Sequence, residues 1–304
     1  MADGKWMEQY IDLRFPLWKK DLKEDLALEI LKEHRPNFLY KYCRPNTHSQ
    51  DYITSGEVWQ PRMFLLNDPY ESLFGYDKKR IRDDLSKFLK EKYKAPSKKQ
   101  LEDYIQKHAY SAEVKANIMR ENLQECFVSC SFAGNQSSPV MWAHYSADHQ
   151  GLCLQYDTKK LPEVVLENQL HPVAYQDKPA DFTDIIFAFL IDNNPLELNP
   201  NFMKRVMFTK SVLWQYENEW RLVKGIIDKS ENQAIKGKKF QIGQPNKVYF
   251  GYRFGKNPPD VKKKFLAICE SLKLIIYIMS PKLDDFIMEA EPVSIAVAKK
   301  RWWL

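Results

Sequence analysis

The chain has 304 residues, of which 44% are hydrophobic and 13% aromatic, and it carries 46 Lys and Arg against 40 Asp and Glu. This composition supports a buried core and excludes an intrinsically disordered chain. The net charge of +6 allows an anionic partner such as a nucleotide or nucleic acid but does not require one.

The length predicts one elaborated domain over residues 1–304. The longest apolar runs, 185–191 and 274–279, are too short to cross a bilayer, and the N-terminus lacks the apolar block of a signal peptide. Five cysteines without a C-x-x-C pair argue against a disulfide framework or a zinc ribbon. We therefore expect a reduced, cytoplasmic protein that does not contact membranes.

In chain order, apolar spacing of three and four predicts a helical N-terminal segment over residues 5–34. An aromatic strand is expected at 38–42, a short helix within 46–56 and an extended piece at 58–66. Residues 77–122 are charged and helical in pattern, with a break at 95–97, which predicts a solvated helical insertion.

Further strands are expected at 126–132, 151–156, 173–175, 247–252 and 274–279, and further helices at 182–191, 201–208 and 259–272. Residues 225–243 are expected to form a loop or hairpin. The C-terminal part, 254–304, is expected to hold a helix, a strand and a basic aromatic tail. Short strands alternating with helices predict an α+β fold with a mixed or largely antiparallel sheet, flanking helices and the helical insertion.

Residues 209–223 contain the densest group of aromatic and charged side chains. If this segment is a strand, side chains two positions apart share a face, so Glu217, Glu219 and Arg221 lie together. Two carboxylates held that close repel, and the pKa of one should rise unless a cation such as Arg221 or Lys210 lies between them. The segment therefore predicts a charged site.

Two other segments are candidates for polar contacts. Asn67, Asp68 and Glu71 belong either to a capped turn or to a site for a hard cation or a ribose hydroxyl. His144, within 141–149, either ties a helix to a strand or contacts substrate. His149 is five residues away, which is the wrong spacing for two metal ligands on one helical face, so no metal is predicted. The tail 299–303 either meets an anionic surface or docks its tryptophans on the core. No P-loop or G-x-G-x-x-G is present, so any nucleotide must be held by side chains.

Four motifs together resemble a known family. L-Y-K-Y at 39–42, N-D-P-Y-E at 67–71, M-W-A-H-Y at 141–145 continuing through 154, and W-Q-Y-E-N-E-W-R at 214–221 are similar to the signature blocks of the bacterial family called domain of unknown function 2971. The resemblance covers residues 38–253, with the insertion inside it, and the family name carries no function.

The opening strand, helix and strand and the late Glu-x-Glu are also similar to ADP-ribosyltransferases. That likeness implies NAD as substrate, Glu219 as the catalytic carboxylate, Glu217 as the group that activates the acceptor, and Lys41 in place of a first-strand histidine. It also implies aromatic stacking by Tyr40, Tyr42 or Trp214 on the bound nucleotide. Here the expected second-strand serine is missing near Gln60 and Pro61.

The leading hypothesis is an NAD-using transferase or NAD hydrolase, as a bacterial toxin or phage-defence effector, with a nucleotide-like small molecule and a macromolecular acceptor as partners. The alternative is a non-catalytic nucleotide- or nucleic-acid-binding module of a bacterial defence system. A third hypothesis is a buried polar network that only holds the fold. The predicted site comprises catalytic Glu219, Glu217 and Lys41, and substrate-binding Tyr40, Tyr42, Asn67, Asp68, Glu71, His144, Tyr145, Trp214 and Arg221.

Overall fold

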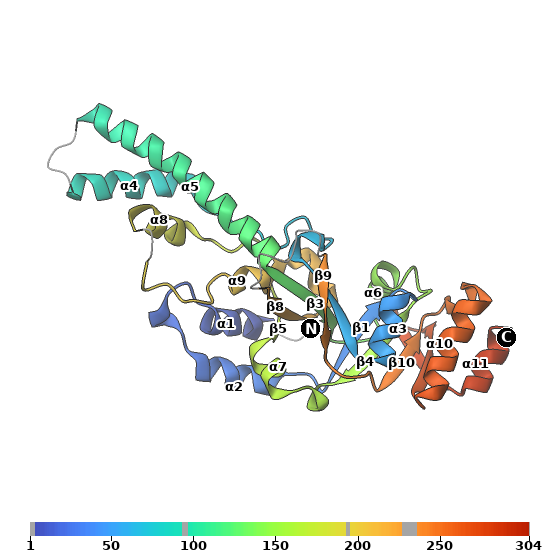
Figure 1. Ribbon diagram of the computed structural model, residues 1–304. Helices are drawn as coiled ribbons and strands as arrows, with labels where there is room; N and C mark the ends of the chain where they lie inside the picture. The colour runs from blue at the N-terminus through green and yellow to red at the C-terminus, as the bar shows by residue number, and fades with distance from the viewer. Residues whose placement is uncertain (1–3, 93–96, 193–194, 227–235, 304) are drawn as a thin grey trace.

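The structure is a computed structural model that describes residues 4–92, 97–192, 195–226 and 236–303 (Figure 1). Within these residues, eight strands form a central sheet. From one edge to the other they are β12 (Met288–Val293), β11 (Ile275–Pro281), β10 (Lys247–Phe250), β4 (Leu152–Asp157), β1 (Phe38–Cys43), β3 (Phe127–Ala133), β8 (Glu219–Gly225) and β5 (Leu170–Pro172). β10 and β11 are parallel, and the other neighbours are antiparallel.

Two small sheets accompany the central one. β2 (Glu57–Pro61) pairs with β9 (Gly237–Gln241), and β6 (Ala174–Gln176) pairs with β7 (Thr209–Ser211). The predicted α+β class with a mixed, mostly antiparallel sheet is confirmed.

The central sheet is nearly divided between β1 and β3. In the described chain these strands share one residue pair, Tyr40 with Ala133, whereas β1 pairs with β4 at six positions and β3 with β8 at seven. β1 and β3 therefore separate beside this pair, and the space between them is lined by side chains.

The helices lie around this sheet and beyond it (Figure 1). They are α1 (Lys5–Arg14), α2 (Glu24–His34), α3 (Thr47–Thr54), α4 (Lys78–Lys92), α5 (Lys98–Cys126), α6 (Pro139–Tyr145), α7 (Glu163–Asn168), α8 (Thr183–Ile191), α9 (Lys204–Met207), α10 (Pro259–Ser271) and α11 (Ile295–Arg301). Short 3-10 helices are η1 (Lys19–Asp21), η2 (Met63–Leu65), η3 (Thr158–Lys160), η4 (Val212–Glu217) and η5 (Phe254–Lys256). α4 and α5 form an arm that projects from the body, as the charged pattern of 77–122 predicts.

Alternation along β1 divides its side chains between two clusters, because successive residues of a strand point to opposite faces. Leu39 and Cys43 belong to the main hydrophobic core. Tyr40 and Tyr42 belong to a smaller cluster with Trp142 of α6. The second cluster is rich in tyrosine and borders the gap between β1 and β3.

The single helical segment predicted for 5–34 is wrong in one respect, because the structure has two helices there. α1 ends at Arg14, and Pro16 follows Phe15, whose backbone is already non-helical at φ −129° and ψ 50°. Proline restricts the residue before it and lacks an amide hydrogen, so the helix cannot continue.

The continuous strand predicted for 209–223 is also wrong. β7 ends at Ser211, whose hydroxyl accepts a hydrogen bond from the amide of Leu213 and caps η4. Asn218 then adopts a left-handed conformation at φ 44°, and β8 begins only at Glu219. Glu217 therefore does not belong to the strand that carries Glu219 and Arg221.

The loop or hairpin expected for 225–243 contains β9, while residues 227–235 lie outside the described chain. In the basic tail, Trp302 is buried against Phe250 and Phe254, and Trp303 is exposed. Across the described residues, we find no helix long and apolar enough to cross a membrane.

Candidate functional site

A cavity of about 160 Å³ lies where β1 and β3 separate. Strands β1, β3 and β8 contribute to its wall, together with the 66–71 turn, α6 and the segment around η4. Its lining residues include Tyr40, Lys41, Tyr42, Asn67, Glu71, Ser129, Ser131, Met141, Tyr145, Lys210, Glu217, Glu219 and Arg221. Segments far apart in the sequence thus meet around one space.

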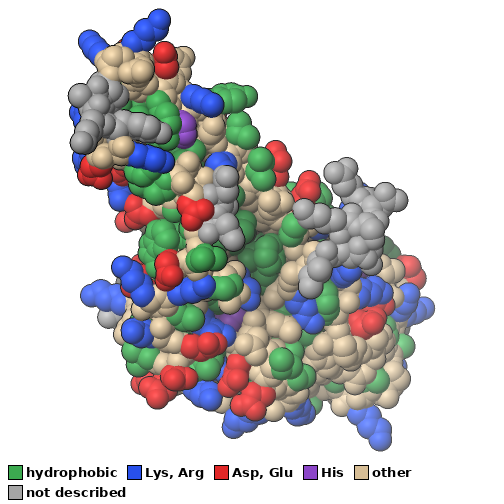
Figure 2. All heavy atoms as spheres, turned by 60° about the vertical axis from the view of Figure 1, so that its left-hand side comes forward, with side chains coloured by type: hydrophobic (Ala, Val, Ile, Leu, Met, Phe, Trp, Pro, Cys, Tyr) green, Lys and Arg blue, Asp and Glu red, His purple; other side chains and the backbone are tan. Residues whose placement is uncertain are grey.

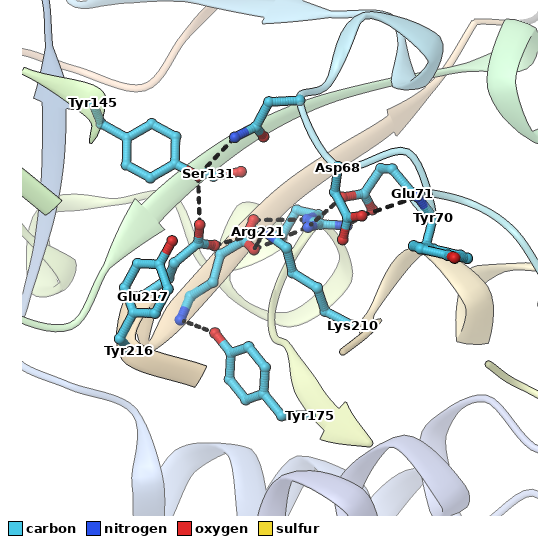
Figure 3. Close-up of polar contacts among 12 residues, drawn as sticks. Asp68, Tyr70, Glu71, Ser131, Tyr145, Tyr175, Lys210, Tyr216, Glu217 and Arg221 are labelled. Atoms are coloured by element: carbon cyan, nitrogen blue, oxygen red, sulfur yellow. Dashed lines mark hydrogen bonds and ion pairs between the residues drawn. The ribbon is translucent and has the colours of Figure 1, made fainter. Parts of the chain in front are cut away.

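Arg221 is the centre of the charged wall. It is 1% exposed and binds two carboxylates through its planar fork (Figure 3). Its Nε and Nη2 donate to Glu219 Oε1 and Oε2 at 2.8 and 2.9 Å, and its Nη1 and Nη2 donate to Glu71 Oε1 and Oε2 at 2.5 and 3.3 Å. Nη1 also donates to the carbonyl of Met207 at 2.5 Å. Such bidentate contacts fix the direction of both carboxylates.

Lys210 joins the two glutamates that the sequence pairs. Its Nζ lies 2.6 Å from Glu217 Oε2 and 3.3 Å from Glu219 Oε2, and it is also 4.7 Å from the centre of the Trp214 ring. Of the two cations that the sequence offers for this position, Lys210 lies between the carboxylates, and the pKa of Glu217 is raised nevertheless. Trp214 covers this lysine and is not part of the cavity lining.

The surroundings shift the pKa values of the two glutamates in opposite directions. Burial alone would raise the pKa of Glu219, but the positive charges of Arg221 and Lys210 outweigh burial and hold it well below its ordinary value. For Glu217, burial and the charge of Glu219 raise the pKa despite Lys210 and Tyr145. Burial likewise raises the pKa of Glu71 against the charge of Arg221. The cavity thus holds one carboxylate whose pKa is lowered beside two whose pKa values are raised.

Tyr145 and Asn67 extend this arrangement across the cavity. The Tyr145 hydroxyl donates to Glu217 Oε1 at 2.5 Å and accepts from Asn67 Nδ2 at 3.0 Å (Figure 3). Burial and the Glu217 carboxylate both raise the pKa of Tyr145, so its hydroxyl stays a donor. His144 is not part of the lining; its Nδ1 lies 3.2 Å from the hydroxyl of Tyr216.

The backbone around Asn218 brings Glu217 and Glu219 together despite their different elements. Asn218 turns the chain from η4 into β8, and its carbonyl accepts a hydrogen bond from the amide of Gly134 at 3.0 Å. A Cβ at Gly134 would lie 2.2 Å from Asn218 Nδ2, so glycine is required for this close approach. The Tyr175 hydroxyl accepts from the Glu219 amide at 2.8 Å and further fixes the start of β8.

The residues of β1 contribute in different ways. Tyr40 and Tyr42 line the cavity, and the Tyr42 hydroxyl donates to the carbonyl of Asn135 at 3.0 Å. Lys41 reaches across the gap to donate to the carbonyl of Ser131 at 2.9 Å, and its Nζ lies 5.8 Å from the centre of the Phe132 ring. Within the described chain, the ion pairs of the cavity glutamates are made by Lys210 and Arg221 and not by Lys41.

A second cavity of about 270 Å³ lies against the same charged wall, because Glu71 and Lys210 line both spaces. Asp68 lines only this second cavity, where the amide of Tyr70 donates to its Oδ1 at 2.9 Å. The predicted N-D-P-Y-E segment is therefore a capped turn whose side chains also face two cavities.

A single space therefore receives most of the predicted residues: Tyr40, Lys41, Tyr42, Asn67, Glu71, Tyr145, Glu217, Glu219 and Arg221. Asp68, His144 and Trp214 lie beside it. The predicted site omits Lys210, Ser129, Ser131 and Met141 as lining residues and Tyr175 as a support. Alternation from Cys130 would place both serines on one face of β3. The sequence offers Lys210 as a counter-charge for the glutamates, but the pairing of β6 with β7, which carry Tyr175 and Lys210, has no signal in the sequence. Among the described residues no group of metal-binding side chains is found.

A family match covers one part of this site. Residues 141–222 match the model described as "Protein of unknown function (DUF2971)". We refer to these matched residues, 141–222, as the DUF2971 segment. This confirms the family resemblance, while the likeness to ADP-ribosyltransferases stays a proposal. No curated protein and no solved structure matches the chain.

The DUF2971 segment supplies the wall that contains Tyr145, Lys210, Glu217, Glu219 and Arg221. The opposite wall, with β1 and the 66–71 turn, precedes the matched residues in the sequence. The cavity therefore lies between the DUF2971 segment and the part of the chain before it.

Proposed function

We propose that the chain cleaves the bond between nicotinamide and ribose in NAD, either transferring ADP-ribose to an acceptor or hydrolysing NAD. The observation that carries this proposal is the pair of carboxylates in one cavity, with the pKa of Glu219 lowered by Arg221 and Lys210 and the pKa of Glu217 raised by burial and by Glu219. This reaction needs one carboxylate that stays charged and one that exchanges a proton.

In this mechanism the glycosidic bond breaks and its electron pair leaves with the nicotinamide, which neutralises the positive charge of the pyridinium ring. The ribose becomes an oxocarbenium-like cation, which the fixed charge of Glu219 stabilises. A water or acceptor hydroxyl then attacks the anomeric carbon, and its proton passes to the ionised form of Glu217. The raised pKa of Glu217 makes that form a better proton acceptor than an ordinary carboxylate.

The dimensions of the two cavities support a division of the proposed ligands between them. A space of about 160 Å³ is close to the roughly 150 Å³ that accommodates one benzene ring in a protein core, so the first cavity suits the nicotinamide ring. Tyr40 and Tyr42 supply aromatic faces there. The second cavity, across Glu71 and Lys210, has room for a water or for one side chain of an acceptor.

The test is NAD consumption by the purified protein, followed by release of nicotinamide, with Glu219→Gln, Glu217→Gln and the exposed Glu289→Gln as matched control. We expect Glu289→Gln to behave as wild type, Glu219→Gln to lose at least 10²-fold in kcat, and Glu217→Gln to lose the rise in rate with pH through the raised pKa of Glu217. Urea unfolding of each variant separates lost chemistry from lost folding. Undetectable NAD cleavage by wild type, or equal rates in wild type and folded Glu219→Gln, would refute the proposal.

The role as toxin or phage-defence effector has its own test, which is growth of bacteria that express the chain. Wild type should deplete cellular NAD and arrest growth, and Glu219→Gln should do neither at equal protein level. Growth arrest by both forms would exclude NAD cleavage as the cause.

The second candidate is the non-catalytic binding module. It is favoured by the full pairing of the carboxylates, since each oxygen of Glu217 and Glu219 has a hydrogen-bond partner. Nucleotide binding without turnover, unchanged in Glu219→Gln, would support it. Steep weakening by salt would point to a nucleic acid, whose phosphates release counterions on binding.

A further inference from the structure

The arm formed by α4 and α5 carries an apolar stripe that stays exposed among the described residues. α5 has 29 residues, which corresponds to a length of about 43 Å at 1.5 Å per residue. Ala112, Ala116 and Leu123 are buried on one side of it, where α4 and α8 pack. η2 and β3 also contact the helix, and Tyr104, Ile105 and Met119 pack partly buried against the core.

The stripe lies on the opposite side of α5. Tyr110, Val114 and Ile118 are 73%, 39% and 51% exposed and follow one another at intervals of four residues. At 100° per residue these three positions fall within about 80° of arc, centred opposite Ala112, Ala116 and Leu123. Figure 2 shows hydrophobic side chains along the arm. Internal packing of the chain therefore does not account for the stripe.

The stripe has a positive side chain at one end and a negative side chain at the other. Lys107 lies seven residues before Val114, and Glu121 lies seven residues after it; both are exposed, on the same face as the stripe. Among the described residues neither side chain forms a salt bridge. In an antiparallel helix pair with Val114 at the two-fold axis, position 107 of one helix meets position 121 of the other.

We propose that this stripe is the contact surface for a second copy of the chain, with the two α5 helices antiparallel and crossing near Val114. Tyr110 packs against the partner subunit's Ile118, and Val114 packs near its own symmetry mate. Lys107 pairs with the partner subunit's Glu121, and the symmetry repeats this ion pair at the other end. Beyond these residues Asp103 faces the partner subunit's Glu125. These two negative charges repel, so the attractive contact does not extend past them.

The charge pattern gives a test that does not depend on activity. Sedimentation equilibrium should show a reversible dimer for the full chain. Lys107→Glu or Glu121→Lys alone should raise the dimer Kd about tenfold or more, because two attractive pairs become repulsive. The double variant Lys107→Glu/Glu121→Lys should return the Kd to near that of wild type, and Asp103→Lys should lower it.

Val114→Asp places a charge at the centre of the contact and should give a monomer whose urea unfolding matches wild type, since Val114 is exposed and belongs to neither hydrophobic cluster of the described residues. The proposal is overturned if the wild-type chain is monomeric up to its solubility limit, as it would be if another protein occupied the stripe. It is also overturned if the charge-swapped double variant dimerises no better than the single variants.

Discussion

Replacing Arg221 by methionine tests whether the charged wall of the cavity also holds the fold. The substitution leaves Glu71 and Glu219 buried without the guanidinium that binds both of them. Removing one partner of a buried ion pair costs about 3–5 kcal/mol. With an unfolding entropy of roughly 2.1 cal/mol/K per residue, the same loss lowers Tm by about 5–8 °C for this chain.

The assay is urea unfolding of wild type and Arg221→Met at pH 8 and pH 5. Once the guanidinium is gone, the pKa of Glu219 rises, so the two carboxylates take up protons as the pH falls and the cost of the substitution shrinks. Glu71→Gln in the same variant should restore part of the lost stability by removing one unpaired charge. As the control, Arg205→Met removes a partner of Asp12 at the surface and should cost about 1 kcal/mol or less.

A loss below about 1 kcal/mol in Arg221→Met would refute the reasoning, because it would mean that the carboxylates relax into water or bind other partners. The same conclusion would follow if the loss were equal at both pH values and Glu71→Gln restored nothing.

Three further predictions concern the neighbourhood of this wall. The pKa of Glu217 is raised in the folded state by burial and by Glu219, so its contribution to stability is present at low pH and is lost as the pH rises through that raised pKa; the unfolding free energy of Glu217→Gln, measured against pH, should lack this decline. Gly134→Ala should cost about 1–3 kcal/mol because its methyl carbon meets the Asn218 side chain, and Asn218→Gly should relieve the cost; an equal loss in the double variant would exclude this contact as its cause. Ala147 follows α6 at φ 47°, so Ala147→Gly should raise the unfolding free energy by about 1 kcal/mol and Ala147→Val should lower it, with no change in either variant contradicting strain at this position.

Local pattern predicts the elements of this fold better than their connections. The aromatic alternation of 38–42 gives β1, and the serine at 97 with Gln100 three positions later forms the capping box that begins α5. β12 is missed because Glu289, Glu291 and Pro292 give an edge strand without an apolar face. The position of β12 at the edge of the sheet explains why it tolerates these residues. That position depends on pairing with β11, which is part of the tertiary structure.

At the site, the spacing of Glu217, Glu219 and Arg221 predicts the charged cluster correctly. The reason given, that all three lie on one strand, is wrong for Glu217. Glu219 and Arg221 do share a face of β8, but Glu217 reaches the cluster through the left-handed turn at Asn218 and its contact with Lys210. The contact of Glu71 with Arg221 spans 150 positions, and only the assembled sheet brings these two residues together. The spacing of residues within a short segment cannot predict such a contact.

The single residue pair between β1 and β3 has a mechanical consequence. Within the described chain the backbone joins the two halves of the sheet at Tyr40 and Ala133, and beside that pair the spacing is maintained by side chains, with Lys41 bonded to Ser131 and Tyr42 bonded to Asn135. Side-chain hydrogen bonds can be exchanged for bonds to a ligand without disrupting a strand ladder. A ligand in the gap can therefore compete for the Lys41 and Tyr42 bonds while the strand ladders and the shared core on the other face stay intact.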